Sequence, residues 1–316
     1  MDLSPVQLGA QRVRDELRKV IIGQEDLFDF LLVALFTNGH ILIEGVPGIA
    51  KTLTAKMLAQ TLAVDFSRIQ FTPDLMPSDV LGTTVFNVKT SEFSFNKGPI
   101  FSNVVLIDEI NRAPAKTQSA LFEVMEEYQI TVDGHTYQLT QPFFVIATQN
   151  PIEQEGTYKL PEAQLDRFLF KINIDYPSLE EELAILQRFK SDFQQLVLAD
   201  VKPAFDQGQI LKCRELVEKV HIDDSLLNYI AQIVHRTRNE GDLFLGASPR
   251  ASLAIMKSSK AMAALNGRDF VSPDDIQRVA YPVLNHRIML TPEREMEGYE
   301  TRDVINNIIQ NIEVPR

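Results

Sequence analysis

The sequence predicts an α/β domain over residues 1–176, built on a parallel β-sheet, followed by an all-helical domain over residues 177–316. The first part alternates short apolar runs with stretches of helical periodicity, which is typical of parallel strands joined by crossover helices. From Pro177 onward the periodicity is helical. A chain of 316 residues has the length for two domains of ordinary size.

Short apolar runs in the first part are the predicted strands of a five-stranded sheet. Each run is apolar at consecutive positions, as expected for parallel strands that helices cover on both faces. The runs are Ile41–Ile43, Ile69–Phe71, Val104–Ile107, Phe143–Ala147 and Phe168–Ile172.

Two β-hairpins are predicted to interrupt this alternation. In the first, apolar residues alternate with polar ones on either side of a loop over residues 89–92. The alternation predicts that Val88 pairs with Phe93 and Phe86 with Phe95. Such an insertion either covers the core or acts as a moving arm that touches a substrate or partner, and the residues alone favour neither.

The second predicted hairpin turns at Asp133-Gly134, which is a strong signal for a two-residue turn. The register that follows places apolar pairs on one face and polar pairs on the other. The pairs are Val132–His135, Ile130–Tyr137 and Tyr128–Leu139 on the first face, and Thr131–Thr136 and Gln129–Gln138 on the second.

Helix starts in the second half are marked by capping residues. Ser178 with Glu181 forms a predicted capping box. Ser248 and Ser272 each precede a proline at the first helical position, which is typical of a helix start. The last segment carries an apolar stripe at helical spacing, predicted to face the core, at Val304, Ile305, Ile308, Ile309 and Ile312.

The candidate phosphate-binding loop lies between the strand Ile41–Ile43 and a helical run over residues 53–62. In this setting backbone N–H groups and the helix N-terminus favour an anion. Lys51 is predicted to reach the β- and γ-phosphates and Thr52 to hold Mg²⁺. The predicted nucleotide contacts here are Val46, Pro47, Gly48, Ile49, Ala50, Lys51, Thr52 and Leu53.

The loop departs from the usual G-x-x-x-x-G-K-[ST] pattern at Ala50, where glycine is expected. Alanine adds one methyl group and is tolerated if the backbone φ there is negative. The motif therefore needs support from other residues.

That support comes from the run Val104–Ile107, which ends in Asp108 and Glu109. Asp108 is predicted to take part in Mg²⁺ binding, and Glu109 to orient and polarise the attacking water as general base. The alternative is that these are two solvated acids at a strand end. That alternative is disfavoured because the phosphate-loop motif and the acid pair occur in the order that this kind of ATP site requires.

Further polar residues follow neighbouring strands. Asn150 ends the run that begins at Phe143, where a side chain could reach a γ-phosphate; a turn asparagine before Pro151 is the alternative. Arg250 falls in the first turn of a capped helix, where the dipole disfavours a cation unless an anion is near. For Arg167, the alternative to a role in catalysis is an ion pair with a nearby acid. Arg112, just after Asp108 and Glu109, is a competing candidate for any catalytic arginine.

Composition narrows the functional class. The formal net charge of −12 argues against non-specific nucleic-acid binding. The longest apolar run, Phe30–Phe36, is too short to cross a bilayer, and we expect no stable membrane insertion. The single cysteine, Cys213, fits a reducing, cytoplasmic compartment and is expected to be buried and inert. The histidines show no metal-ligand spacing.

Together these residues resemble the MoxR family of AAA+ ATPases. The resemblance rests on phrases that occur in order across most of the chain. They are IIGQEDL (Ile21–Leu27), GVPGIAKT (Gly45–Thr52), RIQFTPDLMPSDVLG (Arg68–Gly82), LIDEINRAP (Leu106–Pro114), ATQNP (Ala147–Pro151), LPEAQLDRF (Leu160–Phe168) and GASPRA (Gly246–Ala251).

The resemblance implies a P-loop AAA+ core with a helical lid, and an ATP site between the subunits of a homo-hexameric ring. It implies that Asn150 is sensor 1, Arg167 the arginine finger and Arg250 sensor 2. Ile22 and Gly23 would lie near the adenine. The two hairpins match the helix-2 and pre-sensor-1 insertions, which favours a mechanical, substrate-facing role for them.

The family resembles chaperones that mature or activate client proteins, often with a partner that carries a von Willebrand factor A domain. The expected activity is therefore Mg²⁺-dependent ATP hydrolysis that remodels a client. A DNA-dependent motor and a magnesium-chelatase-like ATPase subunit are the alternatives. A further alternative is a scaffold that binds ATP with little turnover.

Overall fold

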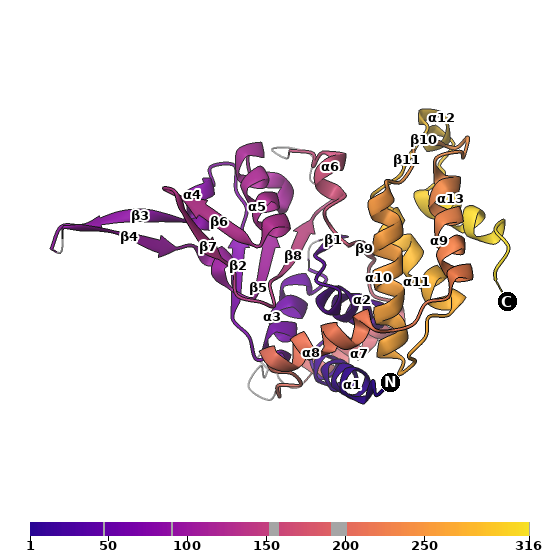
Figure 1. The fold of residues 1–316 in the computed structure, drawn as a ribbon, viewed down its shortest axis with the longest axis horizontal. Coiled ribbons are helices and arrows are strands. Elements are labelled where there is room, and N and C mark those ends of the chain that lie inside the picture. Colours follow the sequence, from indigo (N-terminus) through magenta and orange to yellow (C-terminus); the bar gives the residue numbers. More distant parts are fainter. Residues whose placement is uncertain (47, 90, 152–157, 191–200, 316) are drawn as a thin grey trace.

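The computed structural model describes residues 1–46, 48–89, 91–151, 158–190 and 201–315 (Figure 1). Its centre is a five-stranded parallel sheet in the order β2-β5-β8-β1-β9. The strands are β1 (Ile41–Gly45), β2 (Phe66–Gln70), β5 (Val104–Asp108), β8 (Phe144–Gln149) and β9 (Phe170–Ile174). The predicted sheet is thus confirmed.

Strand β2 begins three residues before the predicted start, at Phe66 instead of Ile69, and it excludes Phe71. It is an edge strand, paired only with β5, and it carries the polar residues Arg68 and Gln70. Its residues do not form a continuous apolar run, so the apolar pattern indicates only its end; an edge strand need not be apolar throughout.

Alternate strand residues face two separate apolar cores. Ile41, Ile43 and their neighbours pack with helices α1 (Ser4–Arg18), α2 (Glu25–Phe36) and α3 (Lys51–Thr61). On the other face, Leu42, Val105 and Ile107 pack with helix α5 (Ala115–Glu127). The sheet is covered on both faces, as its apolar strands require. Shorter segments around it are α4 (Pro77–Leu81), η1 (Pro99–Phe101), η2 (Ile110–Arg112) and α6 (Glu162–Leu165).

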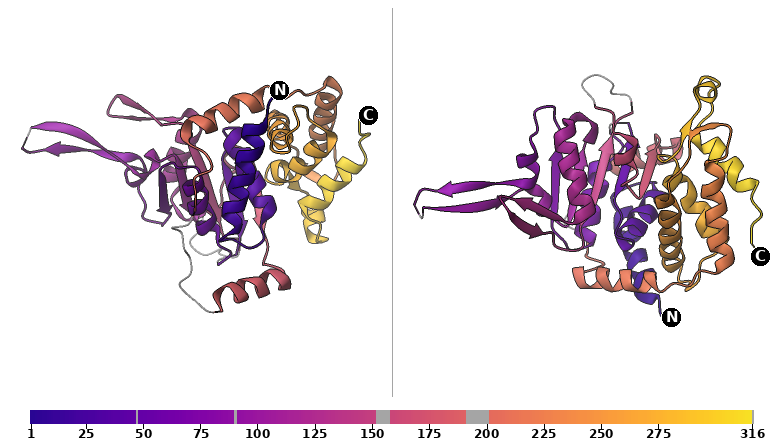
Figure 2. Two further views of the ribbon diagram at one scale, coloured as in Figure 1. Left: turned by 90° about the horizontal axis from the view of Figure 1, so that it is seen from below. Right: turned by 45° about the horizontal axis from the view of Figure 1, so that its top comes forward.

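The first hairpin, β3 (Gly82–Asn87) and β4 (Glu92–Lys97), projects beyond the sheet on the side away from the helical domain (Figures 1 and 2). Its predicted register is wrong by two residues, because Phe86 pairs with Phe93, and Thr84 with Phe95. The side chain of Asn87 accepts a hydrogen bond from the Lys89 N–H at 3.0 Å. This local turn starts the loop earlier than apolar alternation alone indicates.

The second hairpin, β6 (Gln129–Val132) and β7 (His135–Gln138), has the predicted register throughout. The turn residues Asp133 and Gly134 both have positive φ, as the two-residue turn requires. The two hairpins contact each other. Phe95 stacks on Tyr137 with ring centroids 4.4 Å apart, and Thr84 Oγ1 donates to Asp133 Oδ2 at 2.6 Å.

The second half is helical, as predicted. Its helices are α7 (Leu179–Phe189), α8 (Gln207–Glu218), α9 (Asp224–Thr237), α10 (Pro249–Leu265), α11 (Pro273–Leu284), α12 (Pro292–Met296) and α13 (Thr301–Gln310). It also contains a short antiparallel ribbon of β10 (Leu243–Leu245) and β11 (Met289–Leu290), which the sequence pattern did not indicate. No helix among the described residues is both long and apolar enough to cross a membrane.

All three serines stand at the N-cap of a helix, as predicted, but their side chains are used differently. The Ser178 hydroxyl accepts from the Glu181 N–H at 3.3 Å, and Asp275 accepts from the Ser272 N–H at 2.8 Å. The Ser248 hydroxyl instead donates to Asp166 Oδ2 at 3.1 Å. The predicted C-terminal stripe does face the core, with Val304, Ile305 and Ile308 buried.

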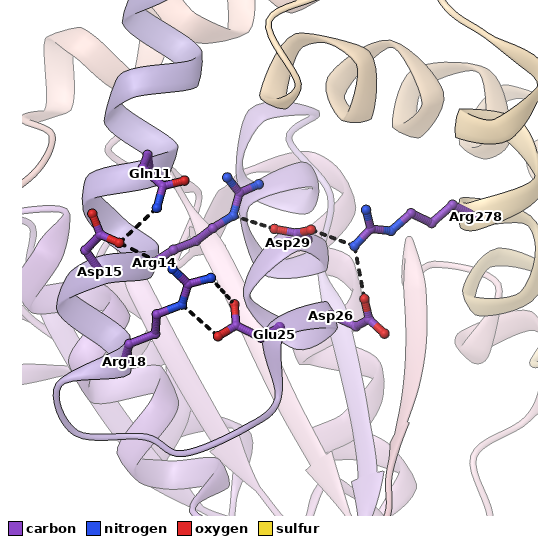
Figure 3. Close-up of polar contacts among 8 residues, drawn as sticks. All are labelled: Gln11, Arg14, Asp15, Arg18, Glu25, Asp26, Asp29 and Arg278. Carbon is purple, nitrogen blue, oxygen red and sulfur yellow. Dashed lines mark hydrogen bonds and ion pairs between the residues drawn. The ribbon is translucent and has the colours of Figure 1, made fainter.

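A network of charged residues joins the first two helices to the helical domain (Figure 3). Asp29 of α2 is buried and accepts from Arg14 of α1 at 2.6 Å and from Arg278 of α11 at 2.7 Å. Arg18 forms a bidentate pair with Glu25 at 2.7 Å for both contacts. Ion pairs between α1 and α2 therefore hold together the two helices that flank the segment with Ile22 and Gly23.

Candidate active site

The predicted phosphate loop connects the end of β1 to the start of α3. Gly48 has a φ of +89°, and an added Cβ there would meet open space, so its glycine is required by conformation. Lys51 is the first residue of α3, and its Nζ donates to the Gly45 carbonyl at 2.6 Å. Pro47 lies outside the described residues.

Ala50 has a φ of +61°, so the condition under which we expected alanine to be tolerated is not met. A left-handed alanine costs roughly 1–2 kcal/mol, because its Cβ crowds the following carbonyl. The chain places alanine at a position whose conformation favours glycine.

Asp108, the last residue of β5, is buried and engages three side chains. Its Oδ2 accepts from Arg68 Nε at 2.6 Å and from Thr52 Oγ1 at 3.4 Å. Its Oδ1 accepts from Thr148 Oγ1 at 3.1 Å. The two predicted metal ligands, Thr52 and Asp108, thus point toward each other.

Glu109 follows with a φ of +58°, which turns its side chain away from the strand direction. Its backbone N–H donates to Thr148 Oγ1 at 3.1 Å. Its Oε2 accepts from Gln70 Nε2 at 2.7 Å and pairs with Arg112 Nε at 3.1 Å. To act as a base toward water, this carboxylate must exchange these donors for the water molecule.

These residues surround a cavity of about 370 Å³ at the carboxyl edge of the sheet. Asn150, directly after β8, is buried and lines it. The lining residues are Gly48, Ala50, Lys51, Thr52, Leu53, Arg68, Gln70, Asp108, Glu109, Thr148 and Asn150. The structure thus brings together most of the predicted phosphate, metal and base residues.

Other predicted nucleotide contacts lie beside this cavity and are not part of its lining. Val46 and Ile49 belong to the loop, and Ile49 is buried. The segment with Ile22 and Gly23 is tied to the loop by Gln24, whose Nε2 donates to the Ile49 carbonyl at 3.1 Å. An added Cβ at Gly23 would overlap the Glu181 carboxylate of α7.

The donor set fits a nucleotide phosphate with a divalent ion. The loop offers a lysine and the N-terminus of a helix of 11 residues, which favour anions. A hydroxyl and a carboxylate 3.4 Å apart are the oxygen ligands that Mg²⁺ takes alongside phosphates and water. Thr52 and Asp108 would hold the ion, which would neutralise charge on the β- and γ-phosphates.

Arg167 and Arg250 are not in this cavity. They line a second one, of about 290 Å³, with residues that precede β1 and β9. Both strands are parallel, so this second cavity is at the amino edge of the sheet, and the candidate nucleotide cavity is at the carboxyl edge. A five-residue strand spans roughly 17 Å, farther than an arginine side chain reaches.

Four residues that shape these sites were not predicted from the sequence. Arg68 and Gln70 stand at alternate positions on β2, so both point to one face, and this pattern at the end of a strand was an available signal. Thr148 joins Asp108 and Glu109 through its hydroxyl. Glu126, at the end of α5, pairs with both arginines of the second cavity and had no local signal.

Comparison with known proteins decides the family. Residues 40–170 match the ATPase family associated with various cellular activities (AAA), and residues 235–308 match the AAA lid domain. The chain is 42% identical over 315 residues to Chaperone MoxR1 of Mycobacterium tuberculosis, covering 97% of this chain and 82% of that one. The chain belongs to the MoxR family of AAA+ ATPases.

Two further proteins are similar to this chain over nearly its whole length. The chain is 48% identical over 314 residues to Uncharacterized protein YeaC of Bacillus subtilis, covering 99% of this chain and 96% of YeaC. A crystal structure of a protein regarded as an ATPase from Cytophaga hutchinsonii superposes with a TM-score of 0.90 at 45% identity, covering 98% and 96% of the two chains. This MoxR-family chain is accordingly an ATPase with an AAA+ core and a helical lid.

Proposed function

We propose that the chain forms a homo-hexameric ring in the cytoplasm, hydrolyses ATP with Mg²⁺, and uses the cycle to remodel or activate a client protein. The relationship to a protein named as a chaperone, across nearly the whole chain, supports the chaperone class. The observation that carries the ring is the place of Arg167 and Arg250, at the sheet edge away from the nucleotide cavity.

Within one subunit, Lys51 and the N-terminus of α3 bind the phosphates, and Thr52 and Asp108 hold the metal. Glu109 accepts a proton from the attacking water once Gln70 and Arg112 release it. Asn150 orients that water or the γ-phosphate from the end of β8. Among the described residues that line the cavity, Arg68 is the only arginine, and it is bound to Asp108; Arg112 beside the cavity pairs with Glu109. A further arginine is therefore needed to meet the charge that develops on the leaving phosphates.

That arginine comes from the next subunit. Arg167 and Arg250 lie side by side, both bound to Glu126, so they act as one unit. A guanidinium that meets the transferred phosphoryl group contributes several orders of magnitude to turnover. We therefore assign both residues to the ATP of a neighbouring subunit and expect the isolated chain to be a poor ATPase.

The coupled hairpins are the proposed client-facing arms. The tip of β3–β4 exposes apolar side chains, with Val88 at 81% and Phe93 at 74% exposure. Exposed apolar side chains that cluster on a projecting element are typical of a surface that binds another protein. A partner with a von Willebrand factor A domain remains a proposal from the family resemblance.

Complementation between two inactive variants tests the shared site. Arg167→Ala subunits retain Lys51 and Glu109 but supply no finger, and Glu109→Gln subunits supply the finger but no base. Mixing them should restore part of the wild-type turnover. The matched control is a mixture of Lys51→Ala and Glu109→Gln subunits. Neither subunit in that mixture can hydrolyse ATP. Absence of rescue at every ratio, with assembly verified, would contradict the proposal.

A trapping experiment addresses the client. Glu109→Gln should bind ATP without hydrolysing it, and the bound state should retain client or partner proteins in a pulldown. Trapping of single-stranded DNA, with stimulation of turnover by it, would favour the DNA-motor alternative. Stimulation by a chelatase partner would favour the magnesium-chelatase-like one. The near full-length match to MoxR1 and the net charge of −12 make remodelling of a protein the preferred function.

A further inference from the structure

One carboxylate holds both arginines of the amino-edge cavity. Glu126 Oε2 lies 3.1 Å from Arg167 Nη2, and Glu126 Oε1 lies 2.8 Å from Arg250 Nη2. The three residues come from α5, the turn before β9 and the start of α10. Each oxygen of Glu126 thus serves one guanidinium, and the two arginines converge on a single negative charge.

The two guanidinium groups are placed by different means. Arg167 lies over the ring of Phe122, 5.9 Å from its centroid, and Phe122 is a buried residue one turn before Glu126 on α5. Arg250 is the second residue of α10, where the helix dipole disfavours a cation. Arg250 therefore depends on a nearby anion, and Glu126 is the carboxylate that pairs with it among the described residues.

The rest of the cavity carries an excess of positive charge. Arg287 is buried and satisfied by Asp166 at 2.7 Å, so this pair is neutral. Lys257 also lines the cavity and makes no hydrogen bond or ion pair within the part of the chain that the structure describes. Three cations therefore face one available carboxylate, Glu126, and the cavity is suited to a further anion with several oxygens.

We propose that Glu126 is an internal counter-ion that holds Arg167 and Arg250 until the γ-phosphate bound to a neighbouring subunit displaces it. This rests on the proposed shared ATP site. Both pairs are partly solvent-exposed, with side-chain exposures between 32% and 53%, so each is weak and the exchange is easy. The γ-phosphate carries more negative charge and more acceptor oxygens than a carboxylate, whereas each oxygen of Glu126 serves only one guanidinium, so the phosphate displaces Glu126.

The proposal gives Glu126 a role in ATP affinity. As long as Glu126 occupies the arginines, it competes with the phosphate for them. Removing its charge should lower the KM for ATP of the neighbouring subunit. The expected change is about two- to fivefold, which corresponds to the free energy of a partly exposed ion pair. The maximal rate should change less, because the same arginines meet the phosphate once ATP is bound.

The complementation pair isolates this effect. Glu126→Gln is placed on the Glu109→Gln subunit, which donates the arginines but cannot hydrolyse ATP itself. ATP turnover by the mixture with Arg167→Ala subunits is then measured against ATP concentration. We expect a lower KM than with the unmodified donor. Glu126→Asp, which keeps the charge, should leave KM near the donor's value.

Glu127→Gln on the donor is the matched control. Glu127 is the next residue of α5, is exposed, and makes no ion pair among the described residues, so this variant removes the same charge without freeing an arginine. A raised or unchanged KM with Glu126→Gln would overturn the proposal. So would an equal shift when Glu126→Gln is placed on the Arg167→Ala subunit. If the unmodified pair shows no rescue, the shared site itself fails, which is a distinguishable result.

Discussion

Arg68 Nε lies 2.6 Å from Asp108 Oδ2, the same carboxylate oxygen that faces the hydroxyl of Thr52. The guanidinium of an edge strand therefore sits against the carboxylate that would help to hold Mg²⁺. A cation at this place competes with the metal for the carboxylate, although the 52% exposure of the Arg68 side chain weakens its hold.

We expect Arg68→Ala to lower the Mg²⁺ concentration that half-saturates nucleotide binding, by about two- to fivefold. Titration of Mg²⁺ against a fluorescent ATP analogue measures this without relying on turnover. The difference should shrink at high salt, where an exposed charge is screened. A higher Mg²⁺ requirement in the variant would mean that Arg68 assists metal binding instead of opposing it.

The positive φ of Ala50, +61°, predicts a stabilising substitution. Ala50→Gly should raise the free energy of unfolding by about 0.5–1 kcal/mol, since relief of the left-handed strain exceeds the entropy lost by glycine. Chemical denaturation without nucleotide measures it. Ala59→Gly, inside the same helix α3, is the control; it should lower stability by about 1–2 kcal/mol, because glycine is a poor helix former and the buried methyl group of Ala59 is lost.

His40 makes stability depend on pH. It is buried, its Nδ1 accepts from the Val145 N–H at 3.1 Å, and its Nε2 lies 3.2 Å from the Met125 carbonyl. Burial lowers its pKa from 6.5 to about 4. Because the folded pKa lies below the unfolded one, the unfolded chain gains a proton first as pH falls, and stability declines from about pH 6.5 toward pH 4.

From pH 7 to pH 5 this residue should cost about 2 kcal/mol of the free energy of unfolding. Urea unfolding at several pH values measures the slope, and His40→Gln should make it shallower whatever the variant's absolute stability. His286 acts in the same direction, because burial also lowers its pKa well below the usual value. An unchanged slope in His40→Gln would show that His40 does not titrate in this way.

The stack between Phe95 and Tyr137, with centroids 4.4 Å apart, predicts that the hairpins move together. Tyr137→Ser removes a contact worth about 0.5–1.5 kcal/mol, so amide exchange along β3–β4 should become several-fold faster. Hydrogen-exchange mass spectrometry reads this directly. Phe93→Ser is the control, since Phe93 contacts Phe86 within its own hairpin. Equal acceleration in both variants would argue against coupling through the stack.

Cys213 is expected to resist thiol reagents in the folded protein. It is buried, and burial raises its pKa to about 11, so little reactive thiolate forms near neutral pH. Labelling with iodoacetamide at pH 8 should proceed only in step with unfolding by urea. Rapid labelling of the native chain would contradict the inert role.

Several features were predictable because they depend on residues close together in the chain. The strand Val104–Asp108 is apolar until its final carboxylate, the Asp133-Gly134 turn sets its own register, and Ser178 with Glu181 caps a helix within one turn. The candidate nucleotide cavity joins residues that are far apart in the chain, and it was predictable for a different reason. Its main residues follow strands whose carboxyl ends meet at one edge of a parallel sheet.

The remaining features depend on which distant segments the fold brings together. Register across the sheet places Gln70 beside Asp108, so that Arg68 and Gln70 reach the two acids. The left-handed turn at Ala50 is imposed by the loop around it.

The sequence by itself determined the parallel sheet, the candidate phosphate loop, the two acids at the end of β5 and the two candidate arginines, Arg167 and Arg250. Only the tertiary structure decided that Arg167 and Arg250 share Glu126, at the sheet edge opposite the nucleotide cavity. An ion pair has no periodicity and no preferred spacing in the chain, so nothing in the local pattern identifies its partner. The partner is chosen when α5, β9 and α10 pack around a common core.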